Sequence, residues 1–191
     1  EDIAAAAASR KRPRDVEGAD ENGGPGGVAP LARHALTAEE QNWLERVTSA
    51  VHGHIPVGDD GIVDPEAAKT LTAVLRSVAN DASTQPLSAH LCSFVAGEVN
   101  ESLRCLPRLV ATMRLLAAML RSASLDVEAY LHQIMPALLT CLVGKRLCAS
   151  PLEDHWSLRQ HAARLLQVLL GRFRTKYADL QPRVTKTLLD A

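Results

Sequence analysis

The chain has 191 residues, of which 47% are hydrophobic and 3% aromatic, and its formal net charge at pH 7 is −1. This length and apolar content are sufficient for one domain with a sizeable core. The scarcity of aromatic side chains disfavours a sandwich or barrel of many short strands and favours helices packed on helices. No apolar run reaches the roughly 18 residues that span a bilayer and no secretory signal opens the chain, so we expect a soluble intracellular protein without a membrane partner.

Residues 1–35 have the composition of a disordered linker. They open with an Ala run and continue through Gly-rich, Pro-containing sequence, which supplies too little apolar surface for a core. Within them the segment SRKRPRD (residues 9–15) offers several cationic side chains on an extended chain, as import receptors require. The segment predicts a nuclear import signal formed by Arg10, Lys11, Arg12 and Arg14.

Apolar residues at three- and four-residue spacing predict seven helices in the remainder of the chain. They cover about 37–51, 65–79, 86–103, 106–121, 127–143, 155–173 and 176–189. Thr37 and Glu40 form a capping box at the first helix, and Asp64 followed by Pro65 opens the second. Short connectors make sequence neighbours into spatial neighbours. The pattern therefore predicts an all-α solenoid of antiparallel helix pairs, with a closed helical bundle as the alternative.

The sixth predicted helix contains the most informative stretch, HWSLRQHAARLL at residues 155–166. Asp154 is placed to cap this helix, and Leu158 and Ala162 share the face that we expect to be buried. The preceding helix contains Pro136, where we expect a bend rather than an end. Together the two helices resemble a HEAT repeat.

A HEAT repeat implies that small residues let its two helices pack closely. It also implies that an Arg of the second helix meets an upstream Asp, which would place Arg159 beside Asp154. The residues expected to form this packing signature are Pro136, Asp154, Leu158, Arg159, Ala162 and Ala163.

Four blocks of the sequence resemble the C-terminal HEAT-repeat domain of subunit six of the general transcription factor TFIID, a TATA-binding-protein-associated factor. They are LTAEEQNWLERVTSAV (36–51), YLHQIMPALLTCLVGKRLC (130–148), DHWSLRQHAARL (154–165) and QPRVTKTL (181–188). The resemblance implies that residues 36–191 form a HEAT-repeat domain, truncated at its C-terminal end because the family's repeat array continues further. It also implies that the family's histone-fold domain is absent from this chain.

The same resemblance implies a function. The domain would be a non-catalytic scaffold of TFIID in transcription initiation by RNA polymerase II, located in the nucleus, and in some organisms shared with SAGA. Its partners would be other TFIID subunits, including subunit nine through the absent histone fold. An uncovered face on the last helix would permit self-association. A generic HEAT-repeat adaptor, such as a phosphatase scaffold or an import-receptor fragment, is the alternative.

Four residues are candidates for partner contact. Trp156 lies off the apolar stripe at the start of its helix, where we favour a structural role beneath the preceding loop over a role as a partner anchor. The block QPRVTKTL supplies the others, because its polar residues are expected on the exposed side of the last helix. The set is Trp156, Arg183, Thr185 and Lys186.

Charge is distributed unevenly along the chain. Residues 37–103 contain 3 Lys and Arg against 10 Asp and Glu, whereas residues 104–191 contain 13 against 6, so the two segments carry net charges of −7 and +7. Either these are solvated outer faces or they support a contact between opposite charges. The cations near the end of the chain also permit weak binding to a DNA backbone, although few aromatics are available to stack on bases. They are Arg172, Arg174, Lys176, Arg183 and Lys186.

Catalytic and metal-binding motifs are missing from the sequence. It has no Gly-rich phosphate loop and no HExxH, so we expect neither an enzyme, nor a cofactor, nor a small-molecule substrate. His52 and His54 fall in a predicted loop, where we expect solvated side chains. The spacing of the possible zinc ligands does not match the usual close pairs, and we expect all four cysteines to be free in a reducing compartment. Those possible ligands are Cys141, Cys148, His155 and His161.

Overall fold

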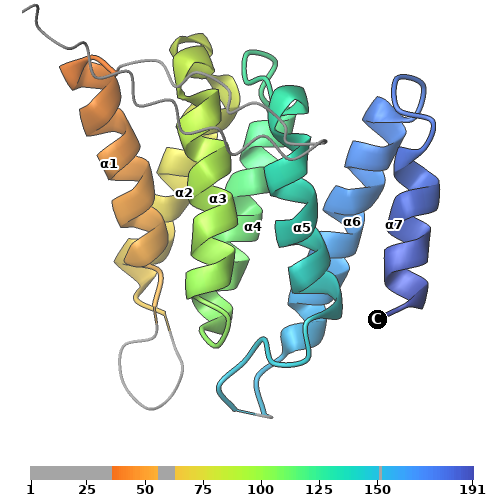
Figure 1. Cartoon of the computed structure of the whole chain (residues 1–191). Coiled ribbons are helices and arrows are strands. Elements are labelled where there is room, and N and C mark those ends of the chain that lie inside the picture. Colours follow the sequence, from red (N-terminus) through yellow and green to blue (C-terminus); the bar gives the residue numbers. More distant parts are fainter. Residues whose placement is uncertain (1–35, 56–62, 151) are drawn as a thin grey trace, which may run out of the picture. The chain divides into compact units, whose positions relative to one another are not determined.

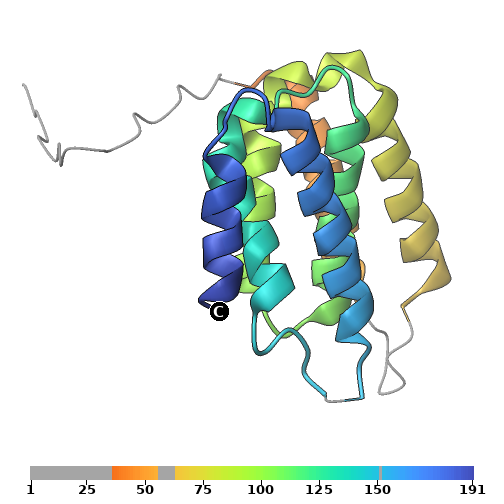
Figure 2. The same cartoon turned by 90° about the vertical axis from the view of Figure 1, so that its right-hand side faces the viewer.

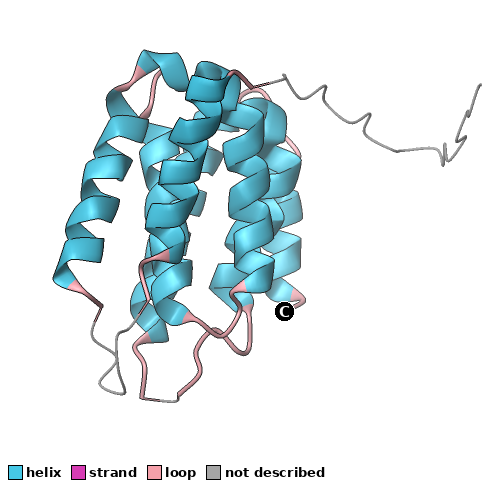
Figure 3. Cartoon of the chain, turned by 90° about the vertical axis from the view of Figure 1, so that its left-hand side faces the viewer, coloured by secondary structure: helices cyan, strands magenta, loops and turns pink. Residues whose placement is uncertain are grey.

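The structure, a computed structural model, describes residues 36–55, 63–150 and 152–191, so the predicted import cluster Arg10, Lys11, Arg12 and Arg14 lies outside the described residues. In the described part the regular elements are helices (Figure 3). They are α1 (Ala38–His52), α2 (Pro65–Asn80), the 3-10 helix η1 (Ala82–Leu87), α3 (Ser88–Glu101), α4 (Leu106–Arg121), the 3-10 helix η2 (Glu128–Tyr130), α5 (Leu131–Val143), α6 (His155–Phe173) and α7 (Leu180–Leu189).

Successive α-helices run in opposite directions and follow one another along the molecule (Figure 1). They form two layers: α1, α3 and α5 in one, and α2, α4 and α6 in the other, as the turned view in Figure 2 shows. Helix α7 lies beside α5 and continues the first layer. The layers extend in one direction and do not close into a ring. The all-α solenoid of antiparallel helix pairs is therefore confirmed, and the closed bundle is wrong.

The helices begin where the sequence places capping residues. Thr37 Oγ1 accepts a hydrogen bond from the Glu40 backbone N–H, and the Glu40 carboxylate accepts one from the Thr37 N–H at 2.8 Å, which completes the capping box. Asp64 accepts the N–H of Glu66 at 3.2 Å before Pro65 starts α2. Each cap satisfies a donor of the first helical turn that has no partner within the helix.

Three helices start two or more residues after their predicted starts. The segment before Ser88 is a 3-10 helix that contains Pro86, and the segment before Leu131 is also a short 3-10 helix. The last helix begins at Leu180 rather than near Lys176, because the backbone N–H groups of Lys176 and Tyr177 bond back to the carbonyl of Phe173 and form turns. The apolar period continues through such turns, so periodicity alone does not find these ends.

Helix α4 lies at the centre of the core, in contact with α1, α2, α3 and α6. Ten of its sixteen residues are buried, among them Leu109, Met113 and Leu116 at three- and four-residue spacing, and Leu115 and Met119 on another side of the helix are buried as well. A helix with neighbours on several sides loses its solvated face. Helix α5 does not end at Pro136, as predicted, and the bend expected there stays a prediction. None of the helices in the described residues is long and apolar enough to cross a membrane.

Candidate protein-binding surfaces

The junction of α5 and α6 is held by Arg159. Its guanidinium donates one hydrogen bond to the carbonyl of Leu142 and another, at 2.6 Å, to the carbonyl of Gly144. These carbonyls lie at the C-terminal end of α5, where carbonyl groups have no helical partner. The expected pairing of Arg159 with Asp154 is therefore wrong: the Arg binds backbone oxygens of the preceding helix.

Asp154 caps α6 instead. Its Oδ1 accepts the backbone N–H groups of Trp156 and Ser157 at 3.1 and 3.2 Å, and its Oδ2 accepts the hydroxyl of Ser157 at 2.5 Å. The hydrogen bonds from Ser157 lower the pKa of the Asp154 carboxyl below its ordinary value. A negative charge at this position also interacts favourably with the helix dipole.

The small residues of the HEAT-like signature have different surroundings. Leu158 and Ala162 are buried against the core, as the signature requires, whereas Ala163 is exposed. Adjacent helical residues point about 100° apart, so a helix can bury one of the two alanines and leave the other in solvent. Close packing at this junction therefore depends on Ala162, and the expectation that Ala163 shares it is wrong.

Trp156 is 66% exposed. Its ring lies 5.2 Å from the ring of His155 and 5.7 Å from the guanidinium carbon of Arg159. The structural role beneath the preceding loop, which the sequence favoured, is therefore wrong. The guanidinium of Arg159 stabilises the orientation of the exposed Trp156 ring, which is available for contact with a partner protein.

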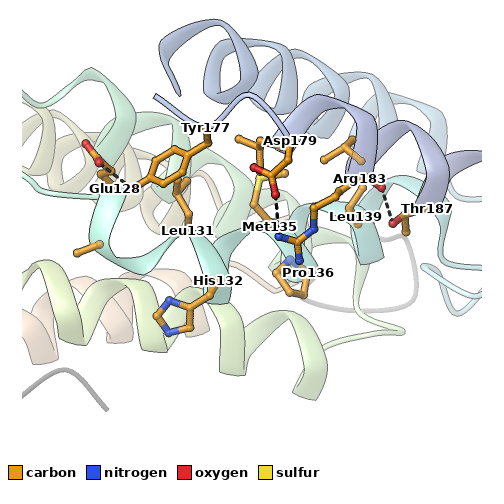
Figure 4. A pocket seen from close by; sticks show the side chains of 13 residues that line it. Glu128, Leu131, His132, Met135, Pro136, Leu139, Tyr177, Asp179, Arg183 and Thr187 are labelled. Atoms are coloured by element: carbon orange, nitrogen blue, oxygen red, sulfur yellow. Dashed lines mark hydrogen bonds and ion pairs between the residues drawn. The ribbon is translucent and has the colours of Figure 1, made fainter. Parts of the chain in front are cut away.

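A cleft of about 480 Å³ separates α7 from α5 (Figure 4). Its floor is apolar, with Met135 and Leu139 from α5 opposite Val184 from α7. One end of the cleft is closed by Glu128, whose carboxylate accepts the Tyr177 hydroxyl at 2.9 Å and pairs with Lys176. The contact with Lys176, followed by that with Tyr177, lowers the pKa of Glu128.

The candidate residues of α7 fall on different surfaces. Arg183 lines the cleft and lies 3.6 Å from Asp179. Thr185 and Lys186 line a shallow hollow on the outer side of α7, next to Leu189, which is 81% exposed. Trp156 contacts residues of its own helix. The structure therefore does not gather the four predicted contact residues into one site.

The cations proposed for DNA binding are partly engaged within the chain. Arg172 donates to the carbonyl of Leu120 at 2.9 Å, Lys176 pairs with Glu128, and Arg183 pairs with Asp179. Cations committed to internal partners release fewer counterions on binding a phosphate backbone. The geometry therefore gives the DNA alternative less support than the sequence count did.

Sequence reasoning missed a groove on the second layer, between α2, α4 and α6. Arg76, Arg114 and Arg121 line it together with His161. One signal was present in the sequence: Arg114 and Arg121 are seven residues apart, which is two helical turns, so they share a face of α4. The residues of α2 and α6 that complete the groove could be identified only from the fold.

Metal ligands are not gathered in the described part of the chain, where no group of three or more His, Cys, Asp and Glu could hold an ion. Cys92 and Cys141 are buried, and burial raises the pKa of each thiol to about 12. Such thiols pack as small apolar groups rather than as nucleophiles.

The chain matches the family model described as the TAF6 C-terminal HEAT repeat domain over residues 32–191. It is 36% identical over 165 residues to the SAGA complex/transcription factor TFIID complex subunit Taf6 of Schizosaccharomyces pombe, covering 86% of this chain and 34% of that protein. It is 35% identical over 162 residues to transcription initiation factor TFIID subunit 6 of Drosophila melanogaster, covering 83% of this chain and 25% of that protein.

Among solved structures, the chain is similar to the TAF6 C-terminal domain from Antonospora locustae. The TM-score is 0.65 at 22% identity, and the match covers 82% of this chain and 70% of that one. This likeness supports the two-layer helical fold. The chain spans about a quarter to a third of the length of the relatives named above. Because the family model covers residues 32–191, the chain belongs to the family of TAF6 C-terminal HEAT repeat domains.

Proposed function

We propose that this chain is a scaffold domain of a TFIID subunit, which binds other subunits during initiation of transcription by RNA polymerase II. The observation that carries the proposal is its identity of 35–36%, over more than four fifths of its length, with proteins named as TFIID subunit 6 or as a subunit of SAGA and TFIID. A subunit shared by two complexes acts through surfaces, so the same domain can serve both.

The described surfaces suit protein binding. In a solenoid each helix pair contacts mainly its neighbours, which leaves long edges free for partners. Here the edges offer exposed anchors, Trp156 and Leu189, beside polar residues that can fix a partner's orientation. We assign partner contact to Trp156 at the start of α6, to Arg183 at the cleft, and to Thr185 and Lys186 on the outer side of α7, as three separate contacts. Pairing with subunit nine through a histone fold would use another part of the subunit.

The proposal includes a location and excludes catalysis. We expect the protein in the nucleus, with residues 1–35 as a linker whose basic cluster serves as the import signal. We expect no reaction, because the chain belongs to a HEAT-repeat family of transcription-factor subunits rather than to an enzyme family.

Affinity purification of the tagged protein from nuclear extract, followed by mass spectrometry, tests this function. We expect TATA-binding protein and several associated factors to copurify. Recovery of a phosphatase or of import cargo in their place would mean that the chain is a generic HEAT-repeat adaptor.

Two variants test the assigned contacts in the same purification. We expect Trp156→Ala and the double variant Arg183→Glu with Lys186→Glu each to lose a subset of subunits. The matched control reverses two other exposed charges, Arg46→Glu with Arg164→Glu, and should retain all of them. Full retention by both test variants would remove these residues from the proposed interface while leaving the scaffold function intact.

A further inference from the structure

We infer that the groove between α2, α4 and α6 is a docking site for an acidic, amphipathic helical segment of a partner protein. This groove, called the basic groove below, has a volume of about 720 Å³. The inference deepens the proposed function and rests on it, since it gives one contact of the scaffold a place and a partner chemistry. The basic groove is lined by Thr72, Leu75, Arg76, Ala79, Asn80, Arg114, Ala117, Leu120, Arg121, His161, Leu165 and Val168.

The basic groove carries positive charge that the described part of the chain does not neutralise. Its lining contains three arginines and neither Asp nor Glu. No ion pair joins Arg76, Arg114 or Arg121 to a carboxylate among the described residues. Arg114 is held at the groove by the hydrogen bond that its Nη2 donates to Thr72 Oγ1 at 3.1 Å. A cleft lined by one sign of charge attracts a ligand of the opposite sign.

The positive charge of Arg114 affects the pKa of His54. Burial lowers the pKa of His54, and the positive charge of Arg114 lowers it further. By contrast, the cleft between α5 and α7 has its charges paired internally, through Lys176 with Glu128 and Arg183 with Asp179. An acidic ligand is therefore attracted more strongly to the basic groove than to that cleft.

The shape of the basic groove fits a helix. Each of the three helices contributes a strip at least seven residue steps long, from Thr72 to Asn80, from Arg114 to Arg121 and from His161 to Val168. Seven steps along a helix are about 10.5 Å, or two turns. The floor is formed by three buried leucines, Leu75, Leu120 and Leu165. Val168, on one wall, is 50% exposed. An amphipathic helix can bury its apolar face on such a floor.

The arrangement of the arginines also favours a helical partner over nucleic acid. Arg114 and Arg121 are two turns apart on α4, so they match carboxylates seven residues apart on one face of a second helix. A phosphate backbone would leave the apolar floor uncovered, and the lining contains no Phe, Tyr or Trp ring on which a base could stack. The observations therefore favour an acidic protein segment.

Fluorescence anisotropy with the full 191-residue chain tests the inference. The probes are a stapled amphipathic helix with Leu on one face and flanking Glu residues seven positions apart, its Gln analogue, and a duplex DNA. We expect the Glu helix to bind at least about tenfold more tightly than the Gln helix, and we expect Arg76→Glu with Arg121→Glu to abolish that difference. Both side chains are exposed, so the variant should fold.

The control is the reversal of two exposed charges outside the basic groove, Arg46→Glu with Arg104→Glu, which should leave the affinity of the Glu helix within about twofold. Equal binding of the Glu and Gln helices, no binding of either, or equal losses in the groove variant and the control would overturn the inference. So would binding of the DNA probe alone, which would make the basic groove a nucleic-acid site.

The nuclear purification separates failure of this inference from failure of the proposed function. If the wild-type chain recovers TFIID subunits and the groove variant recovers the same set, the basic groove is not a subunit contact and the scaffold function stands. If the wild-type chain recovers none of these subunits, the scaffold function fails regardless of the groove.

Discussion

The imidazole Nε2 of His52 and the carboxylate Oε2 of Glu98 lie 2.8 Å apart, although 46 residues separate them in the chain. The Glu98 side chain is only 2% exposed. Its other oxygen accepts a hydrogen bond from the hydroxyl of Ser102 and lies 3.5 Å from Nε of Arg108, close enough for attraction between charges. This buried carboxylate therefore joins the end of α1 to α3 and the first turn of α4.

Replacing Glu98 should weaken the link between these helices. We expect Glu98→Gln to lower the free energy of unfolding by about 1–3 kcal/mol, because Arg108 loses its counter-charge and His52 loses a charged partner. Urea unfolding followed by circular dichroism measures the loss. Glu101→Gln removes the same charge from an exposed position of the same helix and is the matched control. An equal loss in the two variants would show that the buried contacts contribute nothing.

Arg159 should be hard to replace, because both of its backbone contacts depend on the forked guanidinium. We expect Arg159→Ala to destabilise the protein by about 1–3 kcal/mol, since the carbonyls of Leu142 and Gly144 lose their donors. Lys has one amine in place of the fork, so Arg159→Lys should restore only part of the loss. Thermal unfolding measures the loss of stability in both variants. Arg164→Ala, which replaces an exposed Arg of the same helix, is the control. Full rescue by Lys would contradict this account.

The sequence predicted the fold well because the relevant signals are local. The capping box of Thr37 and Glu40 and the pair of Asp64 with Pro65 each lie within a few residues of the helix that they start. Apolar spacing located every α-helix of the described part, because a helix that packs on one side shows its period directly. Errors arose at helix ends, where 3-10 turns keep the same apolar positions.

The surfaces were harder to predict because they depend on contacts between distant residues. Both His52 and His54 were expected to be solvated. His52 is 48% exposed although Glu98 binds it, whereas packing buries His54 to 8% exposure. The partners of Arg159 come from α5 rather than from the adjacent Asp154. The basic groove needs residues from α2, α4 and α6 together. That Arg183 and Thr185 lie on opposite sides of α7 could have been predicted from the sequence, since residues two apart on a helix point about 200° apart.

Ala162 and Ala163 should respond differently to the same substitution. We expect Ala162→Leu to cost about 1–3 kcal/mol, because Ala162 is fully buried at the junction with α5 and a larger side chain would force α5 and α6 apart. Ala163→Leu adds the same atoms on the exposed side and should change stability by no more than about 0.5 kcal/mol. Chemical denaturation measures both. A larger loss from Ala163→Leu would mean that this face of α6 is covered.

His54 should make the protein less stable in mild acid. Burial and the charge of Arg114 hold the pKa of His54 in the folded protein below its ordinary value of about 6.5. Below about pH 6.5 the unfolded chain therefore binds more protons than the folded one. Stability should therefore fall as the pH falls from about 6.5 toward the folded pKa. We expect His54→Gln to flatten this dependence, measured as melting temperature against pH. His132→Gln, at an exposed position, should leave it unchanged, and a flattened curve for that control would assign the effect elsewhere.

The four cysteines should divide into two classes of reactivity. Cys92 and Cys141 are buried with thiol pKa values raised to about 12, whereas Cys105 and Cys148 are half-buried. Because the thiolate is the reacting form, a disulfide reagent at mildly alkaline pH should modify the half-buried pair quickly. The buried pair should react only as fast as the core opens, and all four should react quickly in urea.

Two variants identify the fast cysteines in this experiment. Cys105→Ser and Cys148→Ser should each remove one fast equivalent and leave the slow phase unchanged. Fast modification of Cys141 in the folded protein would contradict its burial beside α6. In that event the junction of α5 and α6 opens without global unfolding, and the contacts of Arg159 do not hold it closed.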